Sequence, residues 1–220
     1  MPRRWIVVLK IIVWALCLSP VSWLAWKATH DLLGANPLSE ITLSTGHWTL
    51  YLLLITLAIS PLRKITHLNW LIRFRRLIGL FAFFYGCLHL MTYLWFDKFF
   101  DVHEIVKDIY KRPFITAGMT AWLLMFPLAL TSTGASIRKL GGKRWQMLHR
   151  LIYASAIAGV VHFWWLVKRD LTRPEIMAAI LTGLLAFRIV DRFVTLGPSR
   201  PALMSSKQAK EVEASGVSPG

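Results

Sequence analysis

Two histidines, His89 and His162, lie deep inside long apolar stretches of the sequence. An ionisable side chain is costly in the interior of a membrane, so these two residues are the first candidates for function. No Asp or Glu lies in the middle of any apolar stretch, and this disfavours a proton-coupled transporter, which usually needs intramembrane carboxylates. Histidine without carboxylate favours metal or haem ligation. No Cys-x-x-Cys-His sequence is present, so covalent c-type haem attachment to this chain is excluded.

The depths of the two histidines match. His89 and His162 lie about 12 and about 14 residues from the inner ends of their apolar stretches, which at about 1.5 Å per helical residue puts them within roughly 3 Å of the same depth. Small residues precede each histidine at spacings of three or four: Gly79, Ala82 and Gly86 before His89, and Ser155 with Ala158 or Gly159 before His162. Such rows leave room for a flat macrocycle, although they also let helices pack closely. We therefore predict that both imidazoles bind the iron of one b-type haem.

A third histidine, His149, precedes His162 by about 13 residues, or roughly 20 Å along a helix. At the matching depth, the inner end of the apolar stretch that contains His89 carries Arg75 and Arg76 and no second histidine. Two guanidinium groups suit an anionic group such as a flavin phosphate or a haem propionate, and ordinary anchoring of a helix end explains them equally well. A zinc or di-iron site is not predicted, because Lys107 stands where a His-Glu-x-x-His motif beginning at His103 needs its second histidine.

The elements that must position these residues are six apolar stretches, each close to the length of about 20 residues that spans a bilayer. They cover residues 5–26, 43–61, 77–96, 114–132, 148–167 and 176–193. The 220 residues are 55% hydrophobic and 17% charged, and the connections are too short for a second globular domain. We predict an all-α membrane protein, a six-transmembrane-helix bundle over residues 1–196, followed by a disordered cytoplasmic tail over 197–220.

The excess of 26 Lys and Arg over 11 Asp and Glu follows the predicted topology. Most basic residues fall at the termini and in the 62–76 and 133–147 connections, so the positive-inside rule places these segments and both termini in the cytoplasm. The 27–42, 97–113 and 168–175 connections then lie outside. This pattern explains the charge without a nucleic-acid partner.

Three further predictions concern individual segments. The first apolar stretch lacks a small-x-small cleavage site, so we expect a retained helix and not a signal peptide. Residues 101–111 form a short amphipathic helix on the outer surface, with its apolar face toward lipid or a partner. Cys17 and Cys87 lie within predicted spans and are expected to be packing residues.

Several runs of the sequence, in order and at family spacing, resemble the ferric-reductase-like transmembrane family over about residues 5–193. The runs are Leu71 to Gly79, Leu88-His89-Leu90, Thr131-Ser132-Thr133, Arg138 to Gly141, Trp145 to Tyr153, and Val161-His162-Phe163. Within the family, the chain is most similar to the bacterial members that serve a periplasmic methionine-sulfoxide reductase. The resemblance implies a multi-pass protein of the bacterial inner membrane that holds haem b and FMN.

The resemblance also implies a function and residue roles. Electrons would pass from the quinone pool to a periplasmic molybdopterin catalytic subunit, the partner in a heterodimer, which repairs methionine sulfoxide in oxidised periplasmic proteins. The chain itself would be a non-catalytic electron-transfer subunit. His89 and His162 match the haem histidines, His149 matches a third histidine tied to haem binding, and Arg75 and Arg76 match a basic pair near the flavin.

The chain departs from the NADPH oxidases and eukaryotic ferric reductases of this family in two ways. It lacks the second histidine of the inner pair, which leaves the number of haems open, and it lacks a nucleotide-binding domain, so direct NADPH oxidation would need a partner. Two other functions remain open at this point. One is a self-sufficient ferric or other metal reductase at the outer surface, and the other is a non-redox scaffold or transporter in which the histidines only pack.

Overall fold

The computed structural model describes residues 3–195, and the regular secondary structure in this range is entirely helical. The all-α prediction is therefore confirmed for this part of the chain, while the predicted tail lies outside it. The chain divides into two compact units, residues 1–184 and 185–220, and the contacts given below lie within the first. The helices are α1 Arg3–Thr29, α2 Pro37–Thr66, α3 Ile72–Met91, α4 Val102–Lys111, α5 Pro113–Leu130, α6 Gly134–Leu140, α7 Gly142–Leu148, α8 Leu151–Leu166 and α9 Thr172–Thr195. A 3-10 turn over Asn69–Leu71 precedes α3, and a π-helical segment over Thr92–Asp97 follows it.

Four of the helices in the described range are long and apolar enough to cross a membrane: Arg4–Thr29, Pro37–Thr66, Asn69–Asp97 and Pro113–Leu130. They coincide with the first four predicted spans. Helix α8 has only 16 residues, fewer than the predicted 148–167, because His149 and Arg150 form a turn between α7 and α8. Helix α9 is long enough but carries charged residues toward both ends. The chain is thus a membrane protein, and these four helices are its candidate membrane spans.

Local sequence signals explain where several helices begin and end. Asn36 caps α2 by accepting a hydrogen bond from the Ser39 N–H at 3.1 Å, with Pro37 in the first turn, where its missing N–H costs nothing. Thr133 caps α6 in the same way through the Ser136 N–H at 3.0 Å. Gly141, with a φ of 75°, lets the chain break between α6 and α7.

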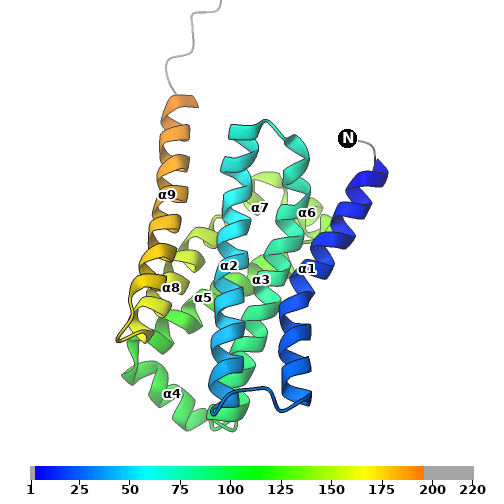
Figure 1. Cartoon of the computed structure of the whole chain (residues 1–220). Helices are drawn as coiled ribbons and strands as arrows, with labels where there is room; N and C mark the ends of the chain where they lie inside the picture. The colour runs from blue at the N-terminus through cyan, green and yellow to red at the C-terminus, as the bar shows by residue number, and fades with distance from the viewer. Residues whose placement is uncertain (1–2, 196–220) are drawn as a thin grey trace, which may run out of the picture. The chain divides into compact units, whose positions relative to one another are not determined.

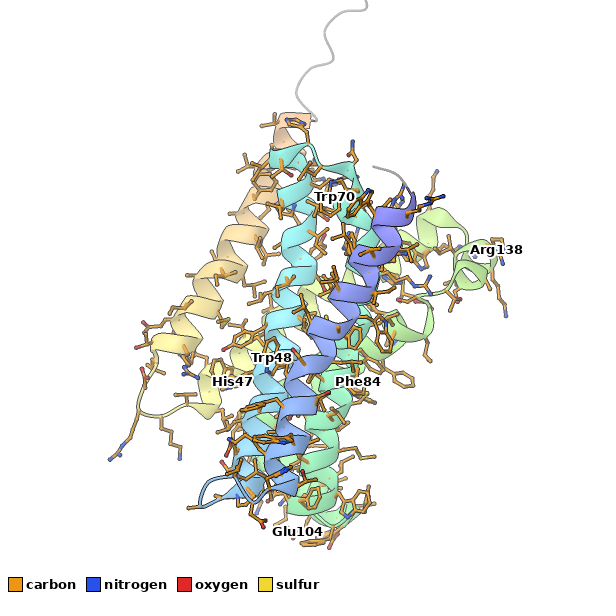
Figure 2. All side chains as sticks on the ribbon, turned by 45° about the vertical axis from the view of Figure 1, so that its right-hand side comes forward. His47, Trp48, Trp70, Phe84, Glu104 and Arg138 are labelled. Atoms are coloured by element: carbon orange, nitrogen blue, oxygen red, sulfur yellow. The ribbon has the colours of Figure 1, made fainter. Side chains whose placement is uncertain are left out.

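Two helix pairs dominate the packing of the first unit, α2 against α3 and α5 against α8. In Figure 1, α2 and α3 run side by side and are joined by a short connection at the upper end, whereas α4 lies at the lower end near the α1–α2 connection. Figure 2 shows Arg138 in the upper half and Glu104 at the lower end. The basic connections and the amphipathic α4 therefore lie toward opposite ends of the first unit.

Helix α1 is tied to α3 at its proline. Pro20 lies inside α1, and the Tyr85 hydroxyl of α3 inserts between two backbone groups of the same turn, donating to the Cys17 carbonyl at 2.7 Å and accepting from the Val21 N–H at 3.1 Å. Tyr85 thus replaces a helical hydrogen bond that would otherwise join Cys17 and Val21. Elsewhere α1 exposes large apolar side chains, Trp5 and Ile11 among them, as expected of a surface in contact with lipid.

The amphipathic helix predicted over residues 101–111 is observed as α4. Asp101 caps it by accepting from the Glu104 N–H at 3.1 Å, but the reciprocal half of a capping box is missing because the Glu104 carboxylate pairs with Lys107. Val102, Val106 and Tyr110 form its exposed apolar face. Both cysteines are free, with Cys17 buried and Cys87 half-buried, as expected of packing residues.

Candidate functional site

His89 on α3 and His162 on α8 face each other. Their ring centroids are 6.0 Å apart, and the ring planes are inclined at 73°. The pairing depends on helix register, because each histidine must point inward at the same depth on helices that belong to different pairs. The structure thus brings together the two residues that the sequence places at matching depths.

Each of these imidazoles is held from behind by a backbone carbonyl. His89 Nδ1 lies 2.9 Å from the Thr42 carbonyl oxygen of α2, and His162 Nδ1 lies 2.6 Å from the Phe114 carbonyl oxygen of α5. A carbonyl oxygen can only accept, so both Nδ1 atoms carry the proton and donate it. The lone pair of each neutral ring is then on Nε2, the atom left available for a metal.

The two rings lie in the wall of an apolar cavity of about 240 Å³, which we call the histidine cavity. Its other walls include Leu50, Leu53 and Met125. The small residues that precede the histidines are divided between two roles. Gly86 and Gly159 line the cavity, whereas Ala82 and Ser155 are fully buried, and the Ser155 hydroxyl donates to the Ala121 carbonyl at 2.9 Å to join α8 to α5.

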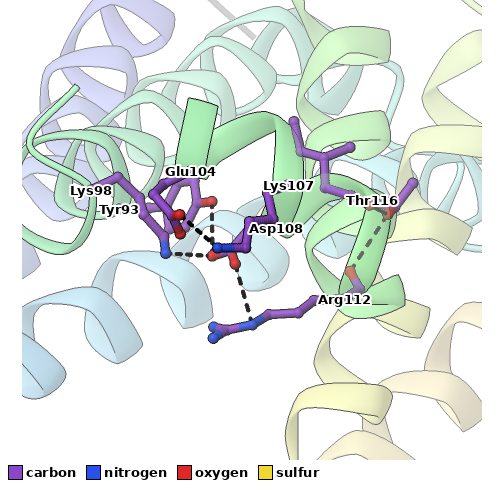
Figure 3. Close-up of polar contacts among 8 residues, drawn as sticks. Tyr93, Lys98, Glu104, Lys107, Asp108, Arg112 and Thr116 are labelled. Carbon is purple, nitrogen blue, oxygen red and sulfur yellow. Dashed lines mark hydrogen bonds and ion pairs between the residues drawn. The ribbon is translucent and has the colours of Figure 1, made fainter. Parts of the chain in front are cut away.

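A polar cluster closes one end of the histidine cavity, where Tyr93, Asp97 and Arg112 line it. Asp108 of α4 organises this cluster, as Figure 3 shows: its carboxylate lies 2.6 Å from Lys98 Nζ and 3.4 Å from Arg112 Nε, and it accepts from the Tyr93 hydroxyl at 3.4 Å. The hydrogen bond from the Lys98 ammonium lowers the pKa of the Asp108 carboxyl below its ordinary value.

A second cavity, of about 470 Å³, lies toward α6 and α7, and we call it the basic cavity. Arg75, Arg76 and His149 all line it, so the structure also brings together the second set of predicted residues. Arg75 Nη1 donates to Ser60 Oγ at 3.4 Å. Arg150 adds a third guanidinium to the lining, and this residue was not predicted as part of the site.

His149 is held differently from the other two histidines. Its Nε2 lies 3.2 Å from Thr131 Oγ1, and that hydroxyl already donates its one proton to the Pro127 carbonyl at 2.6 Å. Thr131 can therefore only accept from His149, which puts the imidazole proton on Nε2 and the lone pair on Nδ1. The Trp145 ring stacks on the imidazole at 3.9 Å and donates to the Thr131 carbonyl. Among residues 3–195, His149 is the one histidine that lines the basic cavity.

The two cavities are close neighbours, because buried Met125 lines both of them. Trp122 lines the histidine cavity and Phe83 lines the basic cavity, and their rings stack with centroids 5.9 Å apart. Trp122 Nε1 is buried and has no hydrogen-bond partner within residues 3–195. In the same range, no group of three or more His, Cys, Asp or Glu residues is placed to hold a metal ion.

Comparison with known proteins identifies the class that this helical membrane fold and its histidine pair represent. The family model described as "Ferric reductase like transmembrane component" matches residues 45–160, more than half of the chain. The match includes His89, His149, Arg75 and Arg76 and ends just before His162.

Curated relatives define the group within this class. The protein-methionine-sulfoxide reductase heme-binding subunit MsrQ of Azospira oryzae is 56% identical over 86% of this chain and 82% of its own length. The proteins of the same name from Herminiimonas arsenicoxydans and Ralstonia nicotianae are 52% and 49% identical, over 82% and 86% of this chain and 84% and 88% of their own lengths. The chain belongs to the ferric-reductase-like transmembrane family and, within it, to the MsrQ group. No solved structure shows a significant match to it.

Proposed function

We propose that the chain is the haem-carrying electron-transfer subunit of a methionine-sulfoxide reductase system. Electrons pass from the quinone pool through this subunit to a periplasmic molybdopterin catalytic subunit, MsrP, with which it forms a heterodimer. The partner then reduces methionine sulfoxide in oxidised periplasmic proteins, and the sulfoxide does not contact this chain. The observation that carries the proposal is the facing pair of imidazoles. In each ring, Nδ1 is hydrogen-bonded to a backbone carbonyl and Nε2 is available to a metal. The names of the relatives supply haem binding and the reductase system.

The residues of the histidine cavity fit a b-type haem. Metal–imidazole bonds are about 2 Å long, so two imidazoles on one metal have ring centroids about 6 Å apart, and the observed separation is 6.0 Å. The buried Trp122 Nε1 gives the cavity an unused hydrogen-bond donor, and Arg112 at its polar end supplies a cation for the propionates. When bound, haem supplies one-electron chemistry whose potential depends on the axial ligands and the surrounding dielectric.

The chain's own residues keep that chemistry in place. His89 and His162 offer Nε2 lone pairs from rings that cannot turn without losing a hydrogen bond. Leu50, Leu53 and Met125 exclude water from between the helices. The Lys98–Asp108 pair anchors α4 and keeps Arg112 at the cavity end.

The basic cavity is the site that we propose for FMN. Its phosphate would pair with Arg75 and Arg76, because guanidinium groups form strong charge-assisted hydrogen bonds to phosphate. His149 presents an Nδ1 lone pair, which can accept a hydrogen bond from the flavin or from a quinol that delivers electrons there. The alternative role of His149, as an iron ligand, would require it to give up the Thr131 hydrogen bond or to bind through Nδ1.

We propose the predicted topology for the whole protein: six spans, with α8 and α9 completing the set, both termini in the cytoplasm, and the bacterial inner membrane as its location. The segregation of basic connections toward one end supports this orientation. The basic cavity then lies in the cytoplasmic half. The histidine cavity, whose polar end adjoins α4, lies in the periplasmic half, where a periplasmic partner can take electrons.

The experiment is to place the purified chain in proteoliposomes with a quinol and to add MsrP outside. Oxidation of quinol and reduction of a methionine-sulfoxide peptide should both require the chain. Both should be lost with His162→Ala and kept with His30→Ala, which removes an exposed histidine. Peptide reduction at the same rate without the chain would overturn the proposal. Reduction of a ferric chelate at a comparable rate without MsrP would instead make the chain a self-sufficient metal reductase.

A further inference from the structure

The two cavity histidines are held by the same local arrangement on two different helix pairs. In each pair, Nδ1 donates to a carbonyl on the preceding long helix, and the residue four positions after that carbonyl is a glycine. The carbonyls belong to Thr42 and Phe114, and the glycines are Gly46 and Gly118. The histidines follow their carbonyl partners by 47 and 48 residues.

Helix geometry explains why a glycine stands at this position. Side chains of a helix tilt toward its N-terminus, so the Cβ of residue i+4 lies beside the carbonyl of residue i and restricts the approach of a second donor. A Cβ added at Gly118 would lie 2.8 Å from His162 Nδ1, closer than real Cβ contacts come. A Cβ added at Gly46 would lie 3.0 Å from His89 Cε1 and 3.1 Å from Nδ1. Any other residue would push against the imidazole and its hydrogen bond.

Close helix packing alone does not explain these two glycines. The nearest atoms to an added Cβ at Gly46 and Gly118 all belong to the histidine rings. By contrast, an added Cβ at Gly79 or Gly159 would meet Thr56 or Leu50 at 3.4 Å or more, which is ordinary helix contact. The first two glycines therefore act on the imidazoles.

We propose that Gly46 and Gly118 are positioning residues that tune the haem through its two histidine ligands. By leaving the Thr42 and Phe114 carbonyls open, they keep the proton on Nδ1 and direct Nε2 of each ring toward the other. A hydrogen bond from Nδ1 to a carbonyl also makes the imidazole a more basic ligand, which favours ferric over ferrous iron. The inference rests on the proposed function for the presence of haem.

The test uses the full-length protein purified with its haem, as wild type and as the variants Gly46→Ala, Gly118→Ala and Gly183→Ala. Gly183 is a matched control on α9, because an added Cβ there meets nothing within 4 Å while the gain in helix propensity is the same. The measurements are the haem midpoint potential from a spectroscopic redox titration and the EPR spectrum of the ferric protein.

Both cavity variants should show a more positive midpoint potential and an altered low-spin EPR signal, and the change should be larger in Gly118→Ala, where the added Cβ is closer to the ring. If Gly118→Ala loses its haem, a shifted potential in Gly46→Ala still supports the inference. Potentials and EPR spectra identical to those of Gly183→Ala would overturn it, as would equal haem loss in all three variants. Failure of the proposed function is a separate result, in which the wild type itself shows no bis-imidazole haem signal.

Discussion

Replacing Asp108 with Asn should loosen helix α4 from the end of the histidine cavity. The Asp108 side chain is only 8% exposed and its partner Lys98 only 13%, so the substitution leaves a largely buried ammonium without its anion. Removing one partner of a buried ion pair costs about 3–5 kcal/mol, and the residual exposure of Lys98 points to the lower end, about 3 kcal/mol. The same helix carries a matched control, the Lys107–Glu104 pair at 2.7 Å, with side chains 45% and 40% exposed. Water screens such an exposed pair, so it contributes little to the stability of the helix.

Hydrogen exchange followed by mass spectrometry on the protein in nanodiscs measures this difference directly. Since about 1.4 kcal/mol corresponds to a factor of ten, the amides of residues 102–111 should exchange roughly 100-fold faster in Asp108→Asn. In Glu104→Gln they should exchange at nearly the wild-type rate. Equal exchange in the two variants would refute the argument that burial of the Lys98–Asp108 pair anchors α4.

The pH dependence of the same exchange has a predicted sign. Because Lys98 lowers the pKa of Asp108 in the folded protein, the pair stabilises α4 fully above the unfolded carboxyl pKa of about 3.9. Its contribution is lost as the pH falls through the lower, folded value. After correction for intrinsic exchange, the anchoring of α4 should be constant between about pH 5 and pH 8 and weaken below about pH 4, and Asp108→Asn should lack this acid-linked step.

Two further predictions concern the basic cavity and the α1–α3 contact. Replacing Arg75 or Arg76 with Ala removes a hydrogen bond to a charged group worth about 1.5–3 kcal/mol, so FMN should bind roughly 10- to 100-fold more weakly. Acid-released flavin per chain measures this binding, and Arg138→Ala on α6 should keep the wild-type content, so equal flavin in all variants would contradict the site. Tyr85→Phe removes the hydroxyl inserted beside Pro20 and should cost about 1–2 kcal/mol and lower Tm, whereas exposed Tyr110→Phe should not. An unchanged Tm in Tyr85→Phe would show that α1 recovers its own hydrogen bond at no cost.

The helices and the histidine pair could be predicted from the sequence because both depend on regular spacing. Long apolar stretches locate α1, α2, α3 and α5, and a constant rise per residue places His89 and His162 at equal depth. The start of α8 could not be predicted in the same way. The apolar stretch continues back through Leu148, but the turn at His149 and Arg150 is set by the short helix α7 that precedes it.

Contacts between helices could not be predicted as readily from the sequence. Gly46 and Gly118 are visible in the sequence as glycines inside apolar stretches, and each precedes a histidine by a similar interval. Their role, however, depends on backbone carbonyls, which have no sequence signature. The Lys98–Asp108–Arg112 cluster could not be predicted for a related reason. It joins Lys98, after the π-helical segment, to Asp108 in α4 and to Arg112, which follows α4.

His149 could be identified as a candidate site residue from the sequence, but its role could not be predicted from the sequence. Its spacing from His162 is consistent with a second redox site, and it does line the basic cavity with Arg75 and Arg76. The position of the imidazole proton, however, is set by Thr131 at the end of α5. Because the Thr131 hydroxyl donates to the Pro127 carbonyl, it accepts from His149 Nε2. That hydrogen bond distinguishes His149 from His89 and His162, whose Nε2 atoms are free.

The most direct test of the central claim is a dithionite-reduced minus oxidised absorption spectrum of the purified protein, with the haem content measured per chain. The wild type should show a b-type haem spectrum, and His89→Ala and His162→Ala should each lose it, while His30→Ala keeps it. A full haem complement in both cavity variants, or a colourless wild type purified from cells supplied with haem, would contradict the claim that the facing imidazoles hold haem.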